Sequence, residues 1–257
     1  MLADCLWGMA ANWRQWLKPR PRTKRGAGFA ALAAAFLALG FVLLGYLYQN
    51  AIRIPPNTLP WQPVDLNAPP GWIAHWQLNR LADDGPRCRA ALAATPLDFT
   101  PLKNRRMDDG CGFDNVVRAD RSPVAFSPRT SATCSLTAAL YWYQQSLRAA
   151  AQATMHARLV RIDQLGTFAC RNVNSQAEGS LSQHATANAI DIAAFHFADG
   201  RMASVARDYG DDTAKGRFLD AAHDAACRLF DAVLGPRYNR LHANHFHLDM
   251  GPYRICR

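Results

Sequence analysis

The sequence has 257 residues, of which 49% are hydrophobic, and a formal net charge of +9 at pH 7. This length provides one well-buried domain of about 150–200 residues with appendages. Such a charge is typical of nucleic-acid-binding proteins, but six of the 29 cations lie within the first 26 residues, where Asp4 is the only anion. Cations concentrated in this way set membrane orientation, so we expect no nucleic-acid partner.

The first predicted element is a transmembrane helix over residues 27–49, preceded by a basic N-terminal segment, residues 1–26. No charged residue occurs between Arg25 and Arg53, and about 20 apolar residues are enough to cross a bilayer. A cleaved signal peptide and a buried helix are the alternatives. The apolar run exceeds the roughly 7–15 residues of the hydrophobic region of a signal peptide, so we expect an uncleaved anchor with a cytoplasmic N-terminus and an exported remainder.

A proline-rich linker is predicted over residues 50–72, because residues 53–70 hold six of the fifteen prolines. Proline fixes φ and lacks a backbone donor, which favours an extended, semi-rigid spacer. At about 3.1 Å per residue, this spacer would hold a domain up to roughly 60 Å from the bilayer. The folded domain is then expected over residues 73–257.

Six cysteines follow the membrane segment, and Cys5 precedes it. In an oxidising compartment six cysteines indicate three disulfides, and about 15 pairings are open. A zinc cluster is the alternative, but it requires closely spaced cysteine pairs that the sequence lacks. The disulfide candidates are Cys88, Cys111, Cys134, Cys170, Cys227 and Cys256.

The exported part is predicted to be α+β, with a small antiparallel sheet and flanking helices. A helix is expected over residues 134–155, with Ser135 or Thr137 as N-cap, and a second over 213–235, ending at Gly235. Strands are indicated by the alternating segments "ARLVRIDQLG", "NAIDIAAFHF" and "HFHLDM".

An unusual group of histidines lies just before and within the last of these segments: His242, His245 and His247. In a strand, His245, His247 and Asp249 share one face and the intervening apolar residues share the other. Ligands on a rigid strand suit a metal ion. The polar face of an ordinary strand explains the pattern equally well.

A second group of polar residues surrounds Asp191, which interrupts an apolar strand between Ile190 and Ile192. An unpaired buried carboxylate costs several kcal/mol, so Asp191 requires a partner. His184 precedes it closely, and a histidine from the last strand would complete three ligands. Three ligands and a fourth position for water are typical of catalytic zinc. The alternative pairs Asp191 with an arginine and leaves His184 at the surface.

These motifs and the cysteines together resemble the bacterial extensin-like C-terminal domain family. The resemblance covers roughly residues 75–257 and is carried by "CRNVNSQAEGSLSQHATANAIDIAAF", "ACRLFDAVLGPRYNRLHANHFHLD" and "YRIC". It implies a periplasmic domain held at the bacterial inner membrane by a single-pass helix.

That family is similar to the zinc peptidases that include lysostaphin-type endopeptidases and D-Ala-D-Ala peptidases. Their pattern is S-x-H, six residues, D, and later H-x-H, which matches Ser182, His184, Asp191 and the His245/His247 pair. The resemblance implies one Zn²⁺ per chain, held by His184, Asp191 and His247. It also implies that His245 is the general base or stabilises the oxyanion.

Two further residues are candidates for substrate binding. Arg171 matches an arginine of the D-Ala-D-Ala peptidases, and a guanidinium there can hold a substrate carboxylate bidentately. A structural salt bridge with Asp163 or Glu178 is the alternative. Ser182 is a candidate for orienting His184 or the substrate. The alternative is a serine that only forms part of a turn.

One position departs from the D-Ala-D-Ala peptidase pattern. Asn244 stands where those enzymes usually carry a glutamate base, and an amide cannot take up a proton. The role of base then passes to His245, with His242 as second choice. The spacing of His242, His245 and His247 is also similar to that of penicillin-insensitive murein endopeptidases.

The sequence therefore predicts a periplasmic zinc hydrolase that cleaves amide bonds in peptidoglycan peptides. An inactive zinc-binding module that binds the cell wall or acts as a scaffold is one alternative, and a disulfide-stapled domain without metal is another. The remaining histidines are predicted to be structural or exposed: His75, His156, His196 and His223.

Overall fold

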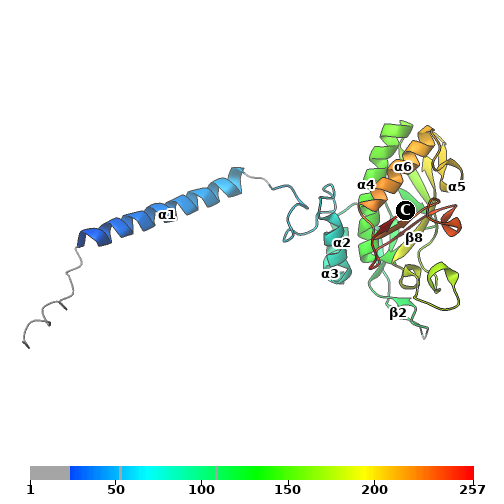
Figure 1. The fold of residues 1–257 in the computed structure, drawn as a ribbon, viewed down its shortest axis with the longest axis horizontal. Coiled ribbons are helices and arrows are strands. Elements are labelled where there is room, and N and C mark those ends of the chain that lie inside the picture. Colours follow the sequence, from blue (N-terminus) through cyan, green and yellow to red (C-terminus); the bar gives the residue numbers. More distant parts are fainter. Residues whose placement is uncertain (1–23, 52–53, 108) are drawn as a thin grey trace, which may run out of the picture. The chain divides into compact units, whose positions relative to one another are not determined.

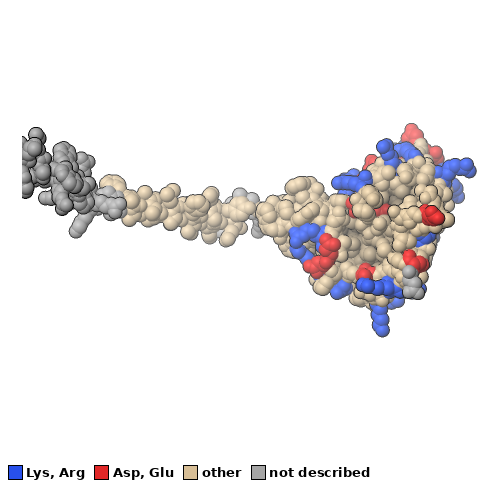
Figure 2. All heavy atoms as spheres, turned by 60° about the horizontal axis from the view of Figure 1, so that its bottom comes forward, with Lys and Arg blue, Asp and Glu red and all other residues tan. Residues whose placement is uncertain are grey.

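The computed structural model describes residues 24–51, 54–107 and 109–257 (Figure 1). The chain divides into two units, residues 1–54 and 55–257. In the first unit, helix α1 (Lys24–Ala51) contains a 22-residue apolar stretch, Gly28–Gln49, with mean hydropathy 2.3 and no buried residue. Its face in Figure 2 carries no charged side chain along this stretch. A helix of this kind is a membrane span or a signal sequence. Residues 1–23 of the predicted basic segment, Cys5 among them, lie outside the described residues.

The second unit is a mixed α/β domain. Its helices are α2 (Ala74–Ala82), α3 (Gly85–Ala93), α4 (Cys134–Met155), α5 (Val205–Asp208) and α6 (Ala214–Cys227), with 3-10 helices η2 (Val173–Ser175), η3 (Gln183–Thr186) and η4 (Arg240–His242). Its strands are β1 (Asp98–Pro101), β2 (Arg105–Arg106), β3 (Gly112–Phe113), β4 (Val116–Arg121), β5 (Ala125–Ser127), β6 (Ser131–Thr133), β7 (Leu159–Gly166), β8 (Ala189–Phe197), β9 (Met202–Ser204), β10 (Ala232–Leu234), β11 (Phe246–Asp249) and β12 (Ile255–Cys256).

The main sheet has seven strands in the order β12-β10-β11-β8-β7-β5, and β9 also pairs with β8. The pairs around β8 are antiparallel, whereas β5–β7 and β10–β12 are parallel. Strands β1, β4 and β6 form a second sheet, and β2 pairs with β3. The predicted α+β class with a mainly antiparallel sheet is confirmed.

The hydrophobic core lies between this sheet and the helices α4 and α6, which pack side by side (Figure 1). Register places Phe246 opposite Ile192 and Leu248 opposite Ile190, and all four side chains are fully buried. Burial of each contributes about 1.5–3 kcal/mol. Because side chains alternate along a strand, the residues between them face away from the core.

Helix α6 is shorter than the sequence indicates. It ends at Cys227, and the predicted helical extension to Gly235 is wrong, because residues 232–234 form strand β10. Val233 pairs with Leu248 of β11 and with Cys256 of β12, so a short apolar run gains sheet partners on both sides. The predicted N-caps of α4 are also wrong: Thr133 caps it by accepting from the Leu136 N–H (3.4 Å).

The expectation of an extended spacer over residues 50–72 is wrong from residue 55 onward. Residues 55–72 belong to the domain, and Leu66 is buried in its core. The Trp142 indole N–H donates to the Ala68 carbonyl (3.0 Å), and the Gln145 amide donates to the Leu66 carbonyl (2.8 Å). Prolines remove backbone donors but keep acceptors, so side chains of α4 can bind such a segment.

All six cysteines of the second unit are paired, which confirms the predicted three disulfides. The pairs are Cys88–Cys134, Cys111–Cys170 and Cys227–Cys256. The first joins α3 to the start of α4. The second holds β3 against the segment that begins at Arg171, and the third joins the end of α6 to β12. The last two therefore restrain segments that line the site described next.

Candidate metal site

The pairing of β8 with β11 places Asp191 directly opposite His247. Opposite residues in an antiparallel pair have Cβ atoms about 4.5–5.5 Å apart and project to the same side. Their neighbours on both strands point into the core, so these two side chains project from the other face of the sheet. Two of the predicted ligands thus meet through strand register alone.

The third predicted ligand, His184, comes from η3, immediately before β8. Ser182 caps this short helix by accepting from the His184 backbone N–H (3.3 Å). Ala187 then takes a left-handed conformation (φ 55°) that reverses the chain into β8. Small side chains permit this close turn, and it leaves the His184 ring only 2% exposed above the strand.

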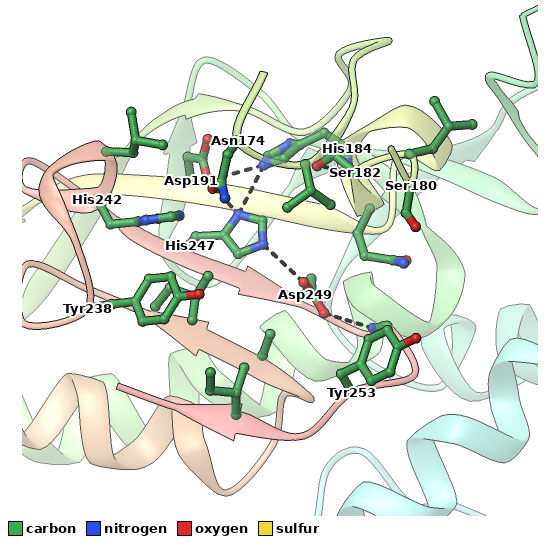
Figure 3. A pocket seen from close by; sticks show the side chains of 18 of the residues that line it. Asn174, Ser180, Ser182, His184, Asp191, Tyr238, His242, His247, Asp249 and Tyr253 are labelled. Carbon is green, nitrogen blue, oxygen red and sulfur yellow. Dashed lines mark hydrogen bonds and ion pairs between the residues drawn. The ribbon is translucent and has the colours of Figure 1, made fainter. Parts of the chain in front are cut away.

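Three donor atoms converge at this position (Figure 3). His184 Nε2 lies 3.2 Å from Asp191 Oδ1 and 3.1 Å from His247 Nδ1, and the latter two atoms are 2.9 Å apart. Although burial opposes ionisation, hydrogen bonds from His184 and His247 hold the pKa of the Asp191 carboxyl well below its usual range. An ionised Asp191 can only accept hydrogen bonds, and if both ring nitrogens donate to it, neither can accept from the other. At most two of the three contacts can therefore be hydrogen bonds. A cation at the centre would satisfy all three atoms.

The dimensions of this triangle fit zinc. Tetrahedral ligands at about 2.0–2.1 Å from Zn²⁺ lie about 3.3 Å from one another, close to the separations of the three donors. Among the described residues, two other groups have ligand-type atoms close together, His223–Cys227–Cys256 and Asp109–Cys111–Cys170. Both contain cysteines in disulfides, which offer no thiolate.

Asp249 belongs to the site, although the sequence only placed it on the same strand face. His247 Nε2–H donates to Asp249 Oδ2 (3.0 Å), and Asp249 Oδ1 accepts from the Gly251 N–H (2.8 Å). Burial opposes protonation of His247, but hydrogen bonds to Asp191 and Asp249 raise its pKa to about 9. A carboxylate behind a ligand histidine fixes the ring and its tautomer.

His245 lies just outside the triangle. Its Nε2 is 3.5 Å from Asp191 Oδ1, and its Nδ1 lies 2.8 Å from Asn244 Oδ1. An Nδ1–H bound to that amide oxygen leaves Nε2 as a free acceptor facing the site. Burial lowers the pKa of His245, so the ring is neutral at pH 7. Asn244 cannot be a base itself. Its amide oxygen instead orients the His245 imidazole, whose Nε2 can accept a proton.

His242 flanks His245, with ring centroids 5.3 Å apart. Asn239 Oδ1 accepts hydrogen bonds from two backbone N–H groups, so it is also the acceptor in its contact with His242 Nδ1 (2.7 Å). His242 Nδ1 therefore carries the proton. Burial, together with His245 and His247, lowers the pKa of His242 to about 4. The ring is buried and neutral and is farther from the donor triangle than His245.

Arg171 points to the donor triangle rather than to either partner expected from the sequence. Its Nη2 lies 3.9 Å from Asp191 Oδ2, and its Nη1 donates to Ser175 Oγ (3.0 Å). The alternative of a salt bridge to Asp163 does not hold, because that carboxylate pairs with Arg161 (2.9 Å) and with His196. The guanidinium remains half-exposed at the edge of the site.

The donor triangle opens into a cleft of about 570 Å³. Tyr238 and His242 lie on one side of His247, and Tyr253 lies on the other (Figure 3). Exposed apolar side chains form much of its rim: Val173, Leu181, Tyr238, Leu241 and Tyr253. None of these was predicted from the sequence, because they lie in loops and short 3-10 helices without a periodic pattern.

The comparison with protein families found one match. The family described as "Extensin-like protein C-terminus" matches residues 86–257. This chain belongs to the extensin-like C-terminal family. The match includes every candidate site residue and all three disulfides. No significant match was found among curated proteins or among solved structures.

The other four histidines of the extensin-like domain make contacts elsewhere. His75 Nε2 lies 2.5 Å from Asp231 Oδ1, and His196 Nε2 lies 2.6 Å from Asp163 Oδ2. His223 Nε2 lies 3.2 Å from the Arg257 carbonyl, and His156 ends α4 in a left-handed conformation. They connect or terminate secondary-structure elements and are absent from the cleft lining.

Replacing Asp249 with asparagine in the extensin-like domain should weaken zinc binding by about 10–100-fold. The amide loses the charge that holds the His247 ring, while the three ligands remain. Zinc affinity is measured by competition with a chromophoric chelator. Asp163→Asn, which alters the carboxylate beside His196, is the matched control and should bind zinc normally. Equal affinities for both variants would contradict a role for Asp249.

Proposed function

We propose that this protein is a membrane-anchored, periplasmic, zinc-dependent hydrolase of amide bonds in peptidoglycan peptides. The observation that carries the proposal is the convergence of His184, Asp191 and His247 at the base of a cleft, with His245 beside them. It is supported by the similarity of these motifs to lysostaphin-type endopeptidases, D-Ala-D-Ala peptidases and murein endopeptidases.

His184 Nε2, Asp191 Oδ1 and His247 Nδ1 would hold the ion. Zinc supplies a Lewis acid that polarises the scissile carbonyl and acidifies a water molecule. His245 Nε2, the acceptor beside the triangle, takes up the proton of the attacking water and returns it to the leaving amine. The neutral state of the imidazole at pH 7 favours this role.

The remaining cleft residues would bind the peptide. Arg171 presents a half-exposed guanidinium next to the triangle, where it can bind a substrate carboxylate. Tyr238, Leu241 and Tyr253 offer apolar contact area at the rim and exclude water from the reacting bond when a peptide is bound. Both endopeptidase and carboxypeptidase substrates contain the required carboxylates.

Helix α1 supports the proposed place of action. A helix with 22 apolar residues at the N-terminus supports insertion in the inner membrane, with the disulfide-containing domain in the periplasm. Three disulfides support an oxidising compartment. A domain in that compartment is within reach of the cell wall.

A second candidate function is a zinc-binding module that attaches to the wall without hydrolysis. The observation that favours it is Asn244, because the glutamate base of similar D-Ala-D-Ala peptidases is replaced by an amide. The contact between Asn244 and His245 favours the enzyme instead, since it leaves His245 Nε2 free to accept a proton.

The test is turnover of defined muropeptides by the full chain with zinc in detergent. Cross-linked dimers and monomers ending in D-Ala are both offered, and products are identified by mass. Turnover by the wild type should fall by roughly 10²–10⁴-fold in His245→Gln, because the general base is lost. Zinc content should be unchanged, since this histidine is not a ligand.

His196→Gln is the matched control, as it changes a histidine on β8 outside the cleft, and it should retain full turnover. Zinc bound without any product from the wild type would support the wall-binding module. Full turnover by His245→Gln would show that another group is the base, with His242 the next to test.

A further inference from the structure

Three tryptophans at the start of the domain are exposed: Trp61 (75%), Trp72 (81%) and Trp76 (42%). Tryptophan side chains are on average mostly buried, and clusters of exposed aromatic side chains mark interaction surfaces. Most other large apolar side chains exposed in the described part of this domain line the cleft. The tryptophans therefore form a separate surface, which we call the tryptophan patch.

The three side chains come from one short stretch of the chain, residues 61–76, at the start of the domain. Arg80 on α2 stacks on the Trp76 ring at 4.9 Å, and its Nη1 donates to the Pro60 carbonyl (3.4 Å). Arg80 therefore connects Trp76 to the residue that precedes Trp61. Trp72 lies in the turn that leads into α2, where the Ala74 N–H donates to the Gly71 carbonyl (3.1 Å).

The chain between α1 and the domain is short. The apolar helix ends at Ala51, and the domain begins at Pro55. Four residues span at most about 14 Å. Because residues 55–72 are folded onto α4 rather than extended, no longer spacer follows Ala51 along the chain before the domain begins.

We infer that the tryptophan patch docks on the lipid bilayer that holds α1. Indole rings prefer the membrane–water interface, where the ring is buried and its N–H stays hydrated. Arg80, stacked on the Trp76 ring, adds a positive charge that anionic headgroups attract. A tether this short keeps the domain at a high effective concentration next to the bilayer. The inference rests on the proposed membrane anchoring by α1.

The test uses the full chain with a specific protease site inserted between Ala51 and Pro55. The protein is reconstituted in phosphatidylcholine–phosphatidylglycerol vesicles, cleaved, and separated by flotation. The released domain should float with the vesicles. Its partition should fall by roughly tenfold or more in the triple variant Trp61→Gln, Trp72→Gln, Trp76→Gln, since binding scales with buried apolar area.

The matched control replaces three exposed apolar side chains outside the patch, Leu165→Gln, Leu241→Gln and Tyr253→Gln, and should float like the wild type. Equal loss in both variants would overturn the inference. Thermal unfolding confirms that each variant is folded.

Alkaline extraction of the uncleaved chain separates the two ways of failing. If the intact chain is extracted, α1 does not anchor the protein, and both the anchoring and the docking are wrong. If the intact chain resists extraction but the released domain remains in solution, only the docking is wrong. Neither result bears on the zinc site, because turnover is measured separately in detergent.

Discussion

Replacing His247 with alanine is expected to remove zinc from the protein and to abolish muropeptide hydrolysis at the same time. The His247 Nδ1 atom faces both other donors, and the ring is held by Asp249 behind it. Its loss leaves two ligands for a metal that requires three from the protein in a catalytic site. Zinc content should fall from about one per chain to below about one tenth.

Metal analysis after dialysis and muropeptide turnover are measured on the same preparations. His196→Ala is the control, because it removes a histidine of β8 that pairs with Asp163 outside the cleft. It should keep both zinc and activity. Turnover by a zinc-free His247→Ala protein would contradict the proposed function, and unchanged zinc content would contradict the proposed ligands.

Removing the disulfide between Cys88 and Cys134 should lower the free energy of unfolding by about 4 kcal/mol. The bond closes a loop with a sequence separation of 46 residues, so its absence increases the entropy of the unfolded chain. Both cysteines are completely buried where α3 meets the start of α4. The double variant Cys88→Ala/Cys134→Ala is compared with wild type by urea unfolding in a mild detergent.

Cys5→Ala is the control, since the three disulfides use the other six cysteines. It should unfold like the wild type. The double variant should retain zinc when folded, because neither cysteine lies near the donor triangle. A change in stability below about 1 kcal/mol would show that native packing, rather than the cross-link, holds α3 in place.

Local patterns in the sequence were sufficient to predict the strands that carry the site. The alternation of "NAIDIAAFHF" and "HFHLDM" places Asp191 and His247 opposite an apolar face, and both segments are strands with that face in the core. The helix over residues 134–155 was predicted with correct bounds for the same reason: its apolar residues repeat at helical spacing. Helix α1 could be predicted from the length of its apolar run and the absence of charged residues alone.

Local patterns were insufficient where several structures suit the same residues. Residues 228–235 read as the end of a helix, but β11 and β12 provide hydrogen-bond partners that make residues 232–234 a strand. The proline-rich segment reads as a spacer, but donors on α4 bind its carbonyl groups. In both cases the deciding partner is distant in sequence, so tertiary contacts override local preference.

The sequence by itself determined which residue types are available for chemistry: two histidines and an aspartate in strand or turn positions, and six cysteines for an oxidising compartment. Only the tertiary structure decided which of the 15 disulfide pairings forms, and that Arg171 faces Asp191. It also revealed Asp249 behind His247 and Asn244 beside His245. The disulfides and the Arg171–Asp191 contact join segments distant in sequence, so they depend on strand register and loop paths that no single segment specifies. Asn244 and Asp249 lie within two residues of the histidines they contact, and there the structure decided only the orientation of the side chains.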